Sequence, residues 1–233
     1  MRLSPMIRLA SFALAAAVIL VVPVALHAQN AVGGQGSTFK DTSMLKLPAG
    51  VRVAILDFDD LECPACAHAF PITHTALEHY KIPLIHHDFP LQMHKWSRDA
   101  AVSARYLLDK VSPEVSEEFR RDVFASQNSI SSKDDLDQFT RKWFTTHKQQ
   151  MPFVVDPTGR FAAEVQADYT LGERLGVQQT PTIIVLHPQG WTQVMDVAQL
   201  YSVIDAALAE TPAKPTAAAH TGAHTATHKS TKN

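Results

Sequence analysis

Two cysteines lie three positions apart in the short stretch CPAC, residues 63–66, and the chain has no others. Shortly before them comes VRVAILDF, residues 51–58, whose apolar and β-branched composition is typical of a strand covered on both faces. The apolar residues after the cysteines share one side of an α-helix: Ala69, Ile72, Ala76 and Tyr80. The cysteines therefore mark the point where a buried strand gives way to a helix, and this junction constrains the fold strongly.

A thiol at the start of a helix is in a distinctive electrostatic position. Backbone N–H groups without helical partners, and the positive end of the helix dipole, stabilise negative charge there. The pKa of Cys63 is therefore expected to fall below that of free cysteine, into a range of roughly 3.5–7.5. Cys63 is the candidate nucleophile. Cys66, one turn later and facing inward, is expected to resolve a mixed disulfide by attacking it.

Two other roles for the pair stay open. A Cys63–Cys66 disulfide that served only as a staple would close a very short loop and remove little entropy from the unfolded chain. A zinc site, with His68 as a further ligand, would normally need four ligands, and the sequence has no second C-x-x-C. Redox chemistry of a Cys63–Cys66 disulfide is favoured over both, and neither a bound metal nor another cofactor is expected.

The rest of the sequence predicts an α/β fold with a block of helices in its middle. The stretch 82–89, IPLIHHDF, is a second strand candidate, and strand, helix and strand in succession form a βαβ unit, which normally has a parallel sheet. Ser112 before Pro113 is a helix-start signal. Helices are predicted over residues 96–109, 113–126, 133–146, 159–175 and 197–208, and a hairpin turn over residues 187–190.

Several separated stretches resemble the DsbA-like thiol:disulfide oxidoreductases of the thioredoxin superfamily, from about residue 51 to residue 208. LDFDDLECPAC is similar to the strand and active-site turn of that superfamily, and Pro71 matches a proline often found in its active-site helix. LGVQQTPTIIV is similar to the segment in which a cis-proline faces the cysteines, and Pro181 matches that proline. DFPLQMHKWSRDAAVSARYL resembles the family's entry into its inserted helical domain.

The resemblance implies a thioredoxin-like fold over residues 45–210, with a helical insertion at about 91–150. It also implies roles for residues outside the cysteines. Thr180, held extended before Pro181, would offer its backbone to a substrate strand. Asp57, near the end of a buried strand, would take the proton of Cys66 if burial raised its pKa, although a capping or solvated aspartate is the alternative.

Two departures from the family pattern bear on the direction of electron flow. The residues between the cysteines are Pro64 and Ala65, so the histidine of the best-known members is absent, and with it a donor that stabilises the Cys63 thiolate. Less thiolate stabilisation implies a less oxidising pair. By resemblance, Thr180 before the proline occurs in disulfide isomerases as well as in oxidases.

The two ends of the chain differ in composition from the part between them. Residues 1–28 have arginines followed by an apolar run, the order of a secretory signal cleaved after Ala28, with an uncleaved membrane anchor as the alternative. Residues 29–44 are expected to be a linker. Residues 211–233 are mostly Ala, Thr, Pro and His and are expected to be a disordered tail.

Charges and histidines elsewhere give no sign of another function. The formal net charge is −2, and no basic stripe is present, so nucleic acid is not an expected partner. His86, His87 and His94 are expected to be surface groups or to line a substrate groove, since successive strand residues point to opposite faces. The tail histidines at every fourth position are read as solvated residues: His220, His224 and His228.

The function expected is that of an exported oxidoreductase in the periplasm or another extracytoplasmic space. Its partners would be exported proteins with cysteines and a membrane or periplasmic protein that resets the pair. An oxidising role is favoured. A reductase or isomerase on the same fold, or a thioredoxin-fold module that binds peptides without turnover, are the alternatives.

Overall fold

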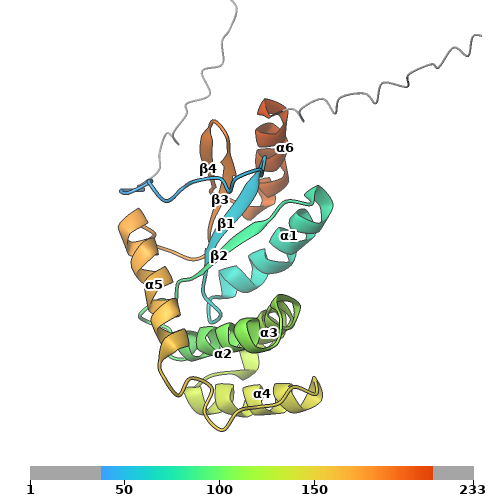
Figure 1. Ribbon diagram of the computed structural model, residues 1–233, viewed down its shortest axis with the longest axis vertical. Helices are drawn as coiled ribbons and strands as arrows, with labels where there is room; N and C mark the ends of the chain where they lie inside the picture. The colour runs from blue at the N-terminus through green and yellow to red at the C-terminus, as the bar shows by residue number, and fades with distance from the viewer. Residues whose placement is uncertain (1–37, 212–233) are drawn as a thin grey trace, which may run out of the picture. The chain divides into compact units, whose positions relative to one another are not determined.

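A computed structural model describes residues 38–211 (Figure 1). The predicted signal segment 1–28, and the predicted tail apart from Thr211, lie outside this range. Within residues 38–211, no helix combines the length and the apolar character needed to cross a membrane.

A mixed sheet of four strands is the centre of the fold, in the order β2-β1-β3-β4. Its strands are β1 (Ala54–Asp59), β2 (Leu84–Asp88), β3 (Thr182–His187) and β4 (Gly190–Val194). The β1–β2 pair is parallel, as the βαβ pattern predicts, whereas β3 runs antiparallel to both β1 and β4. The expectation of a parallel sheet therefore holds for one pair only. The predicted hairpin, which turns back at residues 188–189, accounts for the antiparallel β3–β4 pair, and β3 pairs antiparallel with β1 as well.

The helices begin and end close to the residues that the sequence predicts. They are α1 (Pro64–Tyr80), α2 (Ser97–Lys110), α3 (Pro113–Ser126), α4 (Lys133–Thr146), α5 (Arg160–Leu175) and α6 (Leu200–Glu210), with short 3-10 turns η1 (Gln127–Ser129) and η2 (Val197–Gln199). The hydroxyl of Ser112 accepts a hydrogen bond from the backbone N–H of Val115 and so caps α3, as expected.

Helices cover both faces of the sheet (Figure 1). On one face α1 and α6 pack against Val53, Ile55 and Ile183. On the other, α5 and the segment that precedes β1 cover Leu56 and Phe58. The central strands β1 and β3 are therefore buried on both sides, which explains the unbroken apolar run in β1.

The chain just before β1 is fixed to the end of α5. The backbone N–H of Lys40 donates to the carbonyl of Leu175 (2.7 Å), and the carboxylate of Asp41 accepts from Arg174 (2.9 Å). The ring of Phe39 packs against Trp191. The described end of the predicted linker is thus attached to the sheet domain.

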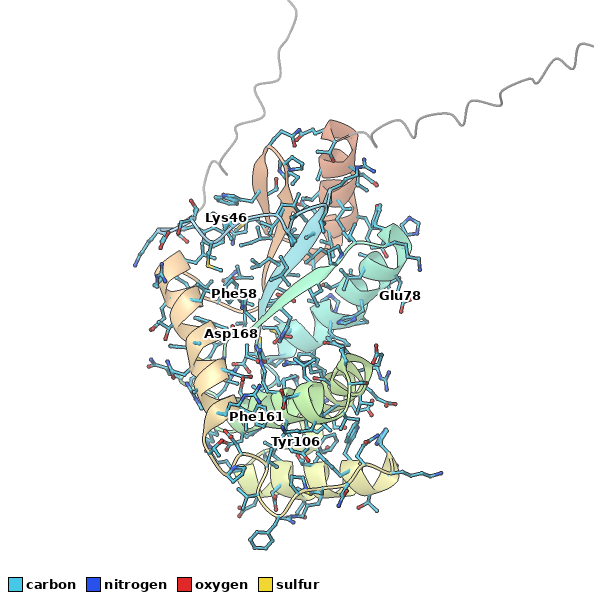
Figure 2. All side chains as sticks on the ribbon, in the orientation of Figure 1. Lys46, Phe58, Glu78, Tyr106, Phe161 and Asp168 are labelled. Carbon is cyan, nitrogen blue, oxygen red and sulfur yellow. The ribbon has the colours of Figure 1, made fainter. Side chains whose placement is uncertain are left out.

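The helical block α2–α4 has a hydrophobic core of its own, which extends to the two cysteines. Figure 2 labels Tyr106 of α2 and Phe161 of α5, whose rings meet edge to face with centroids 6.1 Å apart. Cys63 and Cys66 belong to the same core as Phe119 and Trp96. The predicted thioredoxin-like α/β fold with inserted helices is confirmed, and the cysteines lie where its two parts meet.

Candidate functional site

Cys63 is the residue at which α1 begins. Its backbone is extended (φ −82°, ψ 119°), it occupies the N-cap position, and Pro64 follows it as the first helical residue. Pro64 and Ala65 are exposed and place no hydrogen-bonding side chain beside the thiol. Both cysteines are free thiols, so the structure describes the reduced form, and the disulfide between them stays a prediction.

Hydrogen bonds near the Cys63 sulfur lower the pKa of that thiol to about 5. The main cause is a hydrogen bond with the Cys66 thiol, which outweighs the opposing effect of burial. The backbone N–H groups of Cys66 and Ala65 act in the same direction, as expected for a thiol at a helix N-terminus. Cys63 is only 7% exposed, which is more covered than its position in the sequence suggests, because the helical core reaches it.

Cys66 is 2% exposed and has the opposite tendency. Burial, followed by its hydrogen bond to Cys63 and the charges of Asp59 and Asp57, raises the pKa of the Cys66 thiol. The pair therefore divides into a thiolate at the helix end and a protonated thiol in the interior. That division is what a nucleophile and a resolving cysteine require.

Asp57 and Cys66 line the same small cavity beneath the helix. The cavity has a volume of about 10 Å³, which is room for about one water molecule. Two polar atoms on its lining residues, Asp57 Oδ1 and Thr73 Oγ1, are buried and have no hydrogen-bond partner. Burial, with a contribution from Asp59, raises the pKa of Asp57 well above its usual range. Asp57 can therefore hold a proton near Cys66 at neutral pH.

Thr180 and Pro181 lie across from Cys63, at the start of β3. Their peptide bond is cis, as the resemblance implies, and the Cys63 thiol donates to the Thr180 carbonyl over 3.3 Å. This carbonyl accepts from Cys63 only while the thiol is protonated, and ionisation of the thiol removes the hydrogen bond. An open groove of about 340 Å³ runs beside both residues and is lined by side chains from α1, β4 and the segment after β4, among them His68 and Met195.

A buried group of charges lies next to the cavity, and the sequence analysis missed it. Arg120 of α3 is 2% exposed and pairs with Asp88 of β2 (2.8 Å), and it lies 3.9 Å from Asp59 of β1. His86 Nε2 is 2.9 Å from Asp59 Oδ1 and 3.3 Å from Arg120 Nη1. The available signal was an acidic residue at the end of each of the two parallel strands, Asp59 in β1 and Asp88 in β2. Nothing local in the sequence identifies Arg120 as their partner.

The expectation that His86, His87 and His94 are surface or groove residues is wrong for His86 and His87 of β2, whereas His94, which follows β2, lines an open pocket of about 520 Å³. His86, His87 and His94 are each partly buried and bonded to a carboxylate, and none of the three lines the groove beside Pro181. Their partners are Asp59, Asp168 and Asp60, at 2.9, 2.8 and 2.7 Å. At His86 and His87 successive strand positions do point in opposite directions, but the covering helices leave each side chain only 16% exposed.

Metal-type ligands gather at two places in residues 38–211, and neither includes a cysteine. Asp59, His86 and Asp88 form the first group, whose carboxylates already bind Arg120. The second group is at the surface of the helical block, on α3 and at the end of α4, and consists of Glu118, Asp122 and His147. The thiols therefore have no further ligand set around them in this part of the chain.

Comparison with known proteins places the fold in a family. A model of the thioredoxin family matches residues 51–206, well over half of the chain. The chain belongs to the thioredoxin family. A search of curated proteins gives no match. The matched range covers the sheet, both cysteines, the helical block and the cis-proline segment.

Solved structures with the same fold are DsbA-type proteins of low sequence identity. Wolbachia pipientis alpha-DsbA1 is 17% identical over 72% of this chain and 95% of its own, with a TM-score of 0.58. Bacillus subtilis BdbD is 18% identical over 70% and 89%, with a TM-score of 0.56. Pseudomonas aeruginosa DsbA2 is 21% identical over 70% and 92%, with a TM-score of 0.52. This member of the thioredoxin family therefore shares the DsbA-like fold, and its cysteine pair has the geometry for thiol–disulfide exchange.

Proposed function

We propose that this protein is a thiol:disulfide oxidoreductase that transfers the Cys63–Cys66 disulfide to cysteines of other proteins. The observation that carries the proposal is the asymmetry of the two thiols. Cys63 has a pKa of about 5 at a helix start facing the cis-proline segment, and Cys66 is buried with a raised pKa. Neither a purely structural disulfide nor a metal site requires one thiol with a lowered pKa and one with a raised pKa.

In the forward reaction a substrate thiolate attacks the Cys63 sulfur of the oxidised protein. The S–S bond breaks, and Cys66 leaves with the bonding electron pair. A second substrate thiolate then attacks the substrate sulfur of the mixed disulfide, and Cys63 leaves as a thiolate. The substrate is oxidised to a disulfide and the protein is reduced to a dithiol, so two electrons pass to the protein.

Asp57 is suited to the proton that this exchange moves. Cys66 leaves as a thiolate in a site where burial disfavours charge, so it must gain a proton. Asp57 lines the same cavity, and its raised pKa leaves it protonated at neutral pH. In the reverse direction the carboxylate of Asp57 would accept the Cys66 proton when Cys66 attacks a mixed disulfide.

The low pKa of Cys63 supports an oxidising role. A thiolate that is stable at neutral pH is a good leaving group and stabilises the reduced protein, which makes the disulfide a stronger oxidant. A pKa of about 5 is reached without a histidine between the cysteines, because Cys66 and backbone N–H groups donate instead. The oxidising tendency would be weaker than in a protein that has the histidine as well.

The proposed setting is extracytoplasmic. The signal-like composition of residues 1–28 supports export, and an oxidising compartment would keep the pair in its disulfide form. The groove beside Thr180 and Pro181 is the proposed contact for an extended segment of an exported substrate protein. A membrane or periplasmic partner would remove two electrons and two protons to restore the disulfide.

Alkylation of the reduced protein tests the asymmetry of the thiols. Iodoacetamide added from about pH 4 to pH 9 should modify Cys63 with a midpoint near pH 5, because its thiolate is the reacting form. Cys66 should stay unmodified in the folded protein, since its pKa is raised and its side chain is buried. Mass spectrometry of digested protein identifies the modified cysteine at each pH. Equal modification of both thiols with a midpoint near the free value of about 8.5 would refute the proposal.

A further inference from the structure

Hydrogen bonds join the turn that carries Cys63 to the helical block. The backbone N–H of Cys63 donates to the carbonyl of Asp60 (3.0 Å), which closes a turn between β1 and α1. One carboxylate oxygen of Asp60 accepts from the N–H of Glu62 (2.7 Å), and the other accepts from the N–H of Leu91. The carboxylate of Glu62 accepts from the first N–H groups of α2. Two carbonyl groups of this turn, those of Leu61 and Cys63, are bonded to the helical block as well.

The side chain of Gln127 donates to both of these carbonyl groups. Its side-chain Nε2 donates to the carbonyl of Leu61 (2.8 Å) and to the carbonyl of Cys63 (3.1 Å). Gln127 begins η1, directly after α3, so its backbone is fixed by the helical block. One amide group thus holds the peptide carbonyls of the residues before and after Glu62 in the active-site turn.

The Leu61 and Cys63 carbonyls are in a place that solvent hardly reaches. Leu61 is 1% exposed and Cys63 is 7% exposed. A buried carbonyl without a donor is costly, and water has little access here to replace one. The Cys63 carbonyl also accepts the first hydrogen bond of α1, from the N–H of Ala67 (3.1 Å). The orientation of that peptide therefore affects both the turn and the helix start.

We infer that Gln127 is a positioning residue for thiol–disulfide exchange at Cys63. It fixes the peptide that places the sulfur beside Thr180 and against the N–H groups of Ala65 and Cys66, which favour the thiolate. The hydrogen bonds of the Gln127 side chain go to backbone carbonyls and not to a sulfur, so Gln127 acts through the backbone of Cys63. The inference rests on the proposed function, because it assigns a residue to that reaction. It also gives the inserted helices a part in the chemistry.

Two substitutions remove the donors in different ways. Gln127→Met keeps the length of the side chain and loses both hydrogen bonds, and Gln127→Glu replaces the donors with a carboxylate that repels both carbonyls. Asn128→Asp is the matched control, since it adds the same charge to the same turn at an exposed position. The measurement is the pH midpoint of iodoacetamide modification at Cys63 in each reduced protein. The urea midpoint of each variant is measured alongside.

Both Gln127 variants should raise the midpoint by roughly one pH unit, the size of one hydrogen bond, with the larger shift in Gln127→Glu. Asn128→Asp should leave the midpoint where it is in the wild type. If a Gln127 variant unfolds at lower urea but keeps the wild-type midpoint, Gln127 is merely structural and the inference is wrong. A wild-type midpoint near the free-cysteine value would instead overturn the proposed function, whereas the claim for Gln127 depends only on the difference between the proteins.

Discussion

Replacing Cys66 with alanine should cause the protein to accumulate as mixed disulfides with substrate proteins, whereas replacing Cys63 should abolish exchange. Without Cys66, the Cys63 thiolate still reacts with substrate disulfides, but nothing in the same protein then attacks the resulting bond. Without Cys63, the remaining thiol is 2% exposed and its pKa is raised. Its exchange rate should fall to that of buffer without protein. Non-reducing gels of cells that carry each variant, with mass spectrometry of the adducts, provide the measurement.

The double variant with both cysteines replaced is the control, and it should form no adducts. Adducts of equal yield in the two single variants would contradict the assignment of nucleophile and resolving thiol. So would the absence of adducts in Cys66→Ala when the wild-type protein exchanges disulfides. The reactive residue would then lie elsewhere, or Cys66 would be reachable through a motion of the helical block.

Arg120→Met should destabilise the fold by about 3–5 kcal/mol at neutral pH, as loss of one partner from a buried ion pair does. Arg120 is 2% exposed, and without it the carboxylates of Asp88 and Asp59 lose a cationic partner in the interior. Such a loss is a large part of the roughly 5–15 kcal/mol that stabilises a typical domain. Urea unfolding at constant pH measures it. Arg121→Met is the matched control and should cost little, because that side chain is 56% exposed and pairs only at the surface.

The difference between wild type and Arg120→Met should narrow as the pH falls. Burial alone would raise the pKa of Asp88, but Arg120, His86 and Arg105 outweigh it and hold the pKa below its usual value. A carboxyl with a depressed pKa stabilises the folded protein above its unfolded pKa of about 3.9 and loses that contribution as the pH drops. Below that pH the wild-type protein loses the stabilisation from the Arg120–Asp88 pair, which the variant lacks at every pH. Equal losses in Arg120→Met and Arg121→Met at neutral pH would contradict the role given to the buried charges.

Sequence patterns predicted the features that are local in the chain. The strand-to-helix junction at the cysteines, the bounds of α3 and α4 and the hairpin after His187 all depend on residues a few positions apart. The cis bond before Pro181 came from resemblance to a family. The thioredoxin-like fold followed from these features together, and the family match and the shared fold confirm it.

The sequence did not predict contacts that join the sheet to the helical block. Arg120 meets Asp88 across 32 positions, and Gln127 reaches Cys63 across 64. A charged residue in an amphipathic helix is usually exposed, so its pattern gives no reason to place Arg120 in the interior. The strand histidines were misplaced for a related reason, since strand alternation does not show what covers each face. These contacts depend on how the inserted helices pack.

The reduction potential of the Cys63–Cys66 pair tests the central claim most directly. The protein is equilibrated in buffers of defined reduced and oxidised glutathione, and the fraction of intramolecular disulfide is measured by mass spectrometry after acid quenching. A pKa of about 5 for Cys63 lies between values of about 7 for thioredoxin and about 3.5 for DsbA. We therefore expect one two-electron transition between their potentials of about −270 and −120 mV. A disulfide that stays oxidised below about −300 mV, as structural disulfides do, or a pair that never closes within one chain, would contradict the account.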